Sequence, residues 1–154
     1  MTYEKLPLEV AELNVKEIFG HDNNGLHLNL TPDSIGKFAE QSGVHLKWRP
    51  IVNWLECFQF NTYEYSDEDF LEIAFAKVKP SSGKTLIVTN ESLRDNMIFS
   101  ITYFKDMINF MENEYPRLFN MQFAQPSDFI FLQPEIKLIT MIHHEGVRTK
   151  YCSS

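Results

Sequence analysis

Cysteine and glycine are both scarce in this chain. Of its 154 residues only 2 are cysteine, Cys57 and Cys152, and only 6 are glycine. A disulfide between them is the alternative, but because no secretion signal is expected, we interpret them as two free thiols in a reducing compartment. So few glycines leave little room for the loops that cradle phosphates or dinucleotides. The composition therefore argues against a disulfide scaffold and against a glycine-rich nucleotide site.

Long hydrophobic runs are also missing. No stretch approaches the roughly 18–20 apolar residues that a membrane span requires. The opening residues Met1–Lys5 carry mixed charges, and no apolar segment follows them. We therefore expect no membrane span, no signal peptide and a cytoplasmic location.

Basic residues are outnumbered by acidic ones and form no run. The chain has 14 Lys and Arg against 21 Asp and Glu, which gives a net charge of −7. Pairs such as Lys47 with Arg49, or Arg148 with Lys150, are the largest basic groupings. Because a duplex nucleic acid would be repelled by this charge, we expect no direct nucleic-acid binding. A basic protein partner is electrostatically allowed.

Phenylalanine is abundant. The chain has 13, and 44% of its residues are hydrophobic. A domain of this length buries roughly 68–70% of the surface of its unfolded chain, so most of these rings should lie in a core. No internal repeat or linker divides the sequence, and we expect residues 1–154 to form a single domain.

The N-terminal part of the chain supports two interpretations. Residues 12–30 predict a β-hairpin, because apolar and polar residues alternate on both sides of the turn sequence Asn24-Gly25. A helix over residues 7–19, stopped by the following glycine, is the alternative. Thr31-Pro32-Asp33 then provides an N-cap, a first-turn proline and a first-turn acid, and predicts a helix over about 32–42.

The middle of the chain predicts a second hairpin. Residues 71–78 and 85–89 are strand-like and flank the turn sequence Pro80-Ser81-Ser82-Gly83. A helix over 66–78 is the alternative for the first half of this hairpin. Short strands are also expected at Val44–Trp48 and Phe58–Asn61.

The C-terminal half has the clearest patterns. Apolar residues from Ile101 to Tyr115 recur at the spacing of one helical face and predict the second main helix, over about 101–115. Residues 128–132, 136–143 and 147–151 then predict an antiparallel β-meander whose middle strand, apolar on both faces, should be central. Hairpins and two helices that do not alternate strictly define an α+β fold with a mostly antiparallel sheet.

No segment carries a recognisable catalytic motif. His143-His144-Glu145 is the most enzyme-like, but adjacent histidines on a strand point to opposite faces, and their spacing is not that of the zinc-protease helix. We interpret them as turn and edge residues; a small metal- or ligand-dependent enzyme or binding domain using them is the alternative. Cys57 is interpreted as a small buried hydrophobe. We expect no catalysis, no bound metal and no cofactor.

The most informative segment is acidic. Residues 63–72, which we call the acidic segment, place five carboxylates within nine residues and interleave them with aromatic rings. Its carboxylates and rings are those of Tyr63, Glu64, Tyr65, Asp67, Glu68, Asp69, Phe70 and Glu72. A solvated loop and helix start, where acids suit the helix dipole, is one interpretation. The other is a docking surface, in which the carboxylates pair with Lys and Arg of a partner and the rings supply anchors.

The expected function is binding rather than catalysis. In size, charge and lack of catalytic motifs, the chain is similar to small acidic bacterial proteins that neutralise toxins. This resemblance implies a non-enzymatic immunity protein or antitoxin that blocks a basic partner, such as a nuclease toxin. An oligomeric structural subunit, which would bury surplus phenylalanine against copies of itself, is a further alternative.

Overall fold

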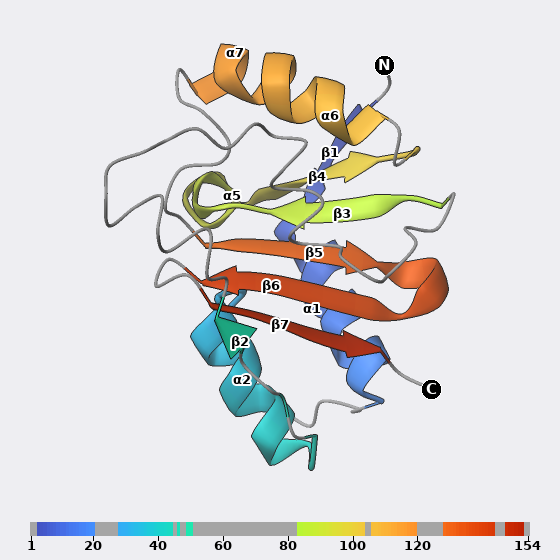
Figure 1. Ribbon diagram of the computed structural model, residues 1–154, viewed down its shortest axis with the longest axis vertical. Coiled ribbons are helices and arrows are strands. Elements are labelled where there is room, and N and C mark those ends of the chain that lie inside the picture. Colours follow the sequence, from blue (N-terminus) through green and yellow to red (C-terminus); the bar gives the residue numbers. More distant parts are fainter. Residues whose placement is uncertain are drawn as a thin grey trace.

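A seven-stranded antiparallel sheet organises the protein in the computed structural model, which describes residues 3–20, 28–44, 46, 49–50, 83–103, 106–119, 128–143 and 147–152 (Figure 1). The strand order is β1-β4-β3-β5-β6-β7-β2. The strands are β1 (Tyr3–Pro7), β2 (Arg49–Pro50), β3 (Thr85–Val88), β4 (Met97–Ile101), β5 (Phe129–Gln133), β6 (Leu138–His143) and β7 (Val147–Cys152). Together with the helices, this sheet confirms the predicted α+β class.

The helices are mostly short. They are α1 (Leu8–Phe19), α2 (Pro32–Gln41), α5 (Asn90–Asp95), and a continuous helical segment made of α6 (Met107–Asn109), the π-helix η2 (Phe110–Glu114) and α7 (Tyr115–Phe119). A 3-10 turn, η3 (Pro134–Ile136), joins β5 to β6. None of the helices among the described residues is long and apolar enough to cross a membrane.

α1 shows that the hairpin predicted over residues 12–30 is wrong and that the alternative helix over 7–19 is correct. Its buried residues are Ala11, Val15, Ile18 and Phe19, which follow the spacing of one helical face. Leu13, which a strand would place on the same face as Val15, is instead 57% exposed. Gly20 ends the helix in the left-handed region at φ 69°. Residues 28–30 are not in a strand.

α2 confirms the helix predicted over about 32–42. The side-chain oxygen of Thr31 accepts a hydrogen bond from the backbone N–H of Ser34 at 3.2 Å, and Pro32 occupies the first turn. This N-cap satisfies a donor that the start of a helix leaves without a partner. Ile35, Phe38 and Ala39 form the buried stripe of α2.

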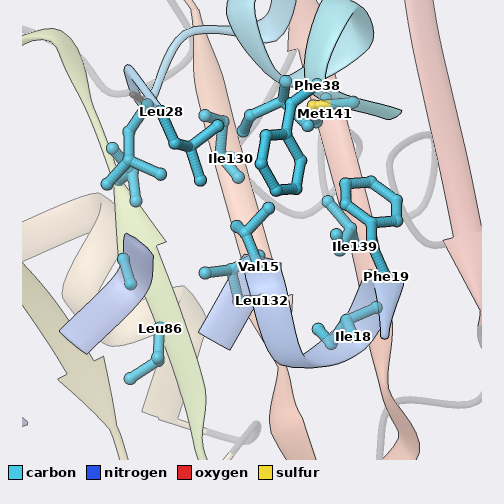
Figure 2. Close-up of a cluster of buried hydrophobic side chains, with 14 of the residues drawn as sticks. Val15, Ile18, Phe19, Leu28, Phe38, Leu86, Ile130, Leu132, Ile139 and Met141 are labelled. Atoms are coloured by element: carbon cyan, nitrogen blue, oxygen red, sulfur yellow. The ribbon is translucent and has the colours of Figure 1, made fainter. Parts of the chain in front are cut away.

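The core lies between these two helices and one face of the sheet, which we call the first face. Figure 2 shows the side chains of α1 and α2 directed onto β3, β5 and β6. The cluster includes Val15, Ile18, Phe19, Phe38, Leu86, Ile130, Leu132, Ile139 and Met141. All of these are at most 8% exposed, and burying such side chains stabilises a fold by about 1.5–3 kcal/mol each.

The helical segment Met107–Phe119 packs against the opposite face of the sheet, which we call the second face. Phe99 of β4 alternates with Ile98, a member of the first-face core, and therefore points to the second face. Its ring lies 4.9 Å from that of Phe110 and 6.0 Å from that of Phe119, between ring centroids. In Figure 1, this helical segment lies at the β1–β4 end of the sheet, whereas α1 and α2 lie toward its β5–β7 end.

The second main helix differs in its bounds from the predicted 101–115. Ile101 is the last residue of β4, where it pairs with Tyr3 and Thr85, and the helix runs from Met107 to Phe119, beyond Pro116. The proline does not end the helix because the preceding turn is widened: the backbone N–H of Tyr115 donates to the carbonyl of Phe110. This wider turn accommodates a residue that has no N–H to donate.

The C-terminal meander is confirmed. β5, β6 and β7 pair in sequence, and β6 lies between the other two. The strand predicted at 85–89 is β3, which pairs with β4 and β5, while its proposed hairpin partner at 71–78 lies outside the described residues. So does the strand predicted at 58–61; at 44–48, the two described residues Val44 and Leu46 are not in a strand. β1, α5 and β4 were not predicted.

Candidate functional site

The acidic segment lies outside the described residues. Tyr63, Glu64, Tyr65, Asp67, Glu68, Asp69 and Glu72 all fall in residues 51–82, as does Cys57. The predicted docking surface therefore stays a prediction.

The histidine cluster is placed only at its first residue. His143 is the last residue of β6 and pairs with Val147 of β7, while His144 and Glu145 lie between them, outside the described residues. Among the described residues, no group of three or more His, Cys, Asp or Glu side chains could hold a metal ion. The predicted role of His143, His144 and Glu145 therefore stays a prediction.

A buried tyrosine links the helical segment to α5. Tyr115 is 2% exposed, and its hydroxyl donates to both carboxylate oxygens of Glu91 at 3.0 Å. Burial raises the pKa of this hydroxyl well above its usual value, and the neighbouring carboxylate of Glu91 adds to the effect. Tyr115 therefore stays protonated and acts as a hydrogen-bond donor, a structural role rather than that of a proton-transfer group near pH 7.

The π-helix η2 places Tyr115 in this buried position. In an α-helix, residues five apart lie on different faces, whereas a hydrogen bond between residues i and i+5 brings them one above the other. Phe110 and Tyr115 are joined by such a bond, and their ring centroids are 6.4 Å apart. The widened turn thus directs two large rings into the same core, beside Phe99 and Phe119.

A second tyrosine ties the edge strand β1 to the same helical segment. The hydroxyl of Tyr3 donates to Oε2 of Glu114 at 3.1 Å, and Nη2 of Arg117 donates to the same oxygen at 2.7 Å. The hydrogen bond from Arg117 holds the pKa of the Glu114 carboxyl below its ordinary value. The hydrogen bond from Tyr3 also lowers this pKa, whereas the burial of Glu114 raises it. The ring of Tyr3 contacts Phe110 at 5.5 Å. No role was predicted from the sequence for Tyr3, Glu114 or Arg117.

The outer surface of α1 carries acids around an exposed leucine. Glu9, Leu13 and Glu17 are four residues apart, so they form one ridge of the helix, which we call the α1 ridge. Both glutamates are exposed, and Leu13 is one of three large hydrophobic residues exposed in the described part of the chain. A carboxylate on either side of an apolar side chain can pair with basic groups that surround an apolar contact.

Three buried polar side chains form a patch on the second face. Thr85 and Thr140 are 0% exposed and Gln133 is 1% exposed. Among the described residues, neither hydroxyl oxygen and neither end of the carboxamide has a hydrogen-bond partner. Each unsatisfied buried polar group costs about 1–3 kcal/mol, so native proteins keep few of them. We call these three residues the polar patch.

The strand register explains why the three residues meet. β3 and β5 pair Leu86 with Leu132, so the next position places Thr85 opposite Gln133. β5 and β6 pair Phe131 with Thr140, which makes Thr140 the diagonal neighbour of Gln133. The sequence signal was weak: Thr140 interrupts an apolar strand, whereas Thr85 begins β3 and Gln133 ends β5, and residue spacing does not show that the three face one another.

Comparisons with known proteins give no family for this chain: no protein-family model, no curated protein and no solved structure matches it.

Proposed function

We propose that the chain is a non-enzymatic protein-binding domain that neutralises a basic protein partner, in the manner of an immunity protein or antitoxin that blocks a nuclease toxin. One observation carries the proposal: the negative charge is concentrated. Residues 51–82 hold six acids and two bases, a net charge of −4 out of the −7 of the whole chain. More than half of the charge excess thus falls in 32 residues that include the acidic segment.

The mechanism follows from what a nuclease must bind. A nuclease site attracts phosphates with Lys and Arg, so a surface that presents several carboxylates can occupy the same position. Charge complementarity accelerates the encounter, and aromatic side chains such as Tyr63 and Tyr65 provide the apolar anchors that slow dissociation. Inhibition then requires steric and electrostatic occlusion of the partner's site and no chemistry on the part of this chain.

The α1 ridge is consistent with this proposal as a secondary contact. Exposed charges elsewhere on the described residues are nearly balanced, and pairs such as Arg94 with Asp95 at 2.9 Å neutralise each other. On the α1 ridge, by contrast, Glu9 and Glu17 flank an exposed Leu13. A ridge of this kind supplies apolar area together with charge, which a purely solvated face does not.

The test compares two variants that change the net charge equally. The first carries lysine at Glu64, Asp67, Glu68 and Asp69. The control carries lysine at four exposed acids of the described residues, Glu4, Glu40, Asp95 and Glu135. A stoichiometric partner isolated from native lysate is titrated against both variants and the unmodified chain by calorimetry.

We expect the first variant to bind the partner about 100-fold or more weakly, because several close charge pairs become repulsive. The control should stay within about tenfold of the unmodified chain, since exposed charges away from the interface act mainly on the association rate. Equal losses in both variants would show that net charge alone matters. Failure to recover any stoichiometric partner would also count against the proposal.

A further inference from the structure

We draw no further inference here: the strongest candidate, the α1 ridge of Glu9, Leu13 and Glu17 on the outer surface of that helix, is two exposed acids around one exposed leucine, and nothing among the residues that the structure describes shows what covers it.

Discussion

Replacing Tyr115 by phenylalanine removes one hydroxyl and leaves the ring in its place. The ring contacts with Phe110 and Phe119, at 6.4 and 4.8 Å between centroids, are retained in this variant. What is lost is the hydrogen bond from the hydroxyl to the two carboxylate oxygens of Glu91, at 3.0 Å each. The substitution therefore isolates the link between the helical segment and α5.

The expected cost is about 1.5 kcal/mol. A hydrogen bond to a charged group contributes about 1.5–3 kcal/mol, and the lower end applies because Glu91 is only half-buried and regains water when the hydroxyl is gone. For a domain of this size, such a loss lowers the melting temperature by about 3–6 °C.

A double-mutant cycle in urea measures the link directly. The free energy of unfolding is determined for the unmodified chain, Tyr115→Phe, Glu91→Ala and the double variant, and we expect a coupling of about 1–1.5 kcal/mol. Tyr103→Phe is the control, because Tyr103 is 51% exposed, and it should change stability by less than about 0.5 kcal/mol. A coupling near zero would refute the reasoning, since it would mean that Glu91 and Tyr115 act independently.

The same pair determines a pH dependence. The pKa of Tyr115 is raised in the folded state by burial and by Glu91, whereas an unfolded tyrosine titrates at about 10. The stabilisation is thus complete below about pH 10 and is lost as the pH rises above it, because only the unfolded chain then releases the proton. The free energy of unfolding of the unmodified chain exceeds that of Tyr115→Phe, and this difference should decrease above about pH 10. An increase in the difference would contradict the raised pKa of Tyr115.

Three further substitutions test local features of the fold by urea unfolding. Thr31→Ala removes the N-cap of α2 and should cost about 1 kcal/mol, while Thr31→Ser should be nearly neutral; equal losses would mean that the side-chain oxygen does not cap the helix. Lys137 has a φ of 51°, which strains a residue other than glycine. Lys137→Gly relieves this strain and should stabilise the fold by about 0.5 kcal/mol, a value that already subtracts the larger entropy of glycine in the unfolded chain. A loss of stability would contradict the left-handed conformation of Lys137. Phe38→Ala empties part of the first-face core and should cost about 3–5 kcal/mol, so a cost below about 1 kcal/mol would place this ring outside the core.

Local chemistry predicted some elements correctly. Thr31 and Pro32 specify the start of α2 by themselves, because a cap and a first-turn proline act within one turn of the helix. The meander was predicted for a similar reason: its strands are short, β5 and β6 are mainly apolar, and turn residues separate the strands. In both places the pattern and its cause lie within a few residues of sequence.

The wrong predictions arose where two periods fit the same residues. Leu13 and Val15 alternate as in a strand, yet Val15 and Ile18 also fit a helix, and packing against β5 and β6 decides for the helix. Ile101 fits the helical face that follows it, but its backbone pairs with β1 and β3. The spacing of apolar residues in the sequence does not show which strands or turns provide the backbone hydrogen-bond partners of a residue.

By itself, the sequence determined the fold class, the capped start of α2, the meander and the concentration of acidic residues that motivates the proposed function. Only the tertiary structure decided that Phe110 and Tyr115 share one core and that Thr85, Gln133 and Thr140 form the polar patch. The physical reason is that the first group depends on composition and on contacts within a turn or a strand. The second depends on a widened helical turn and on strand register, which bring together residues as far apart in sequence as 85 and 140.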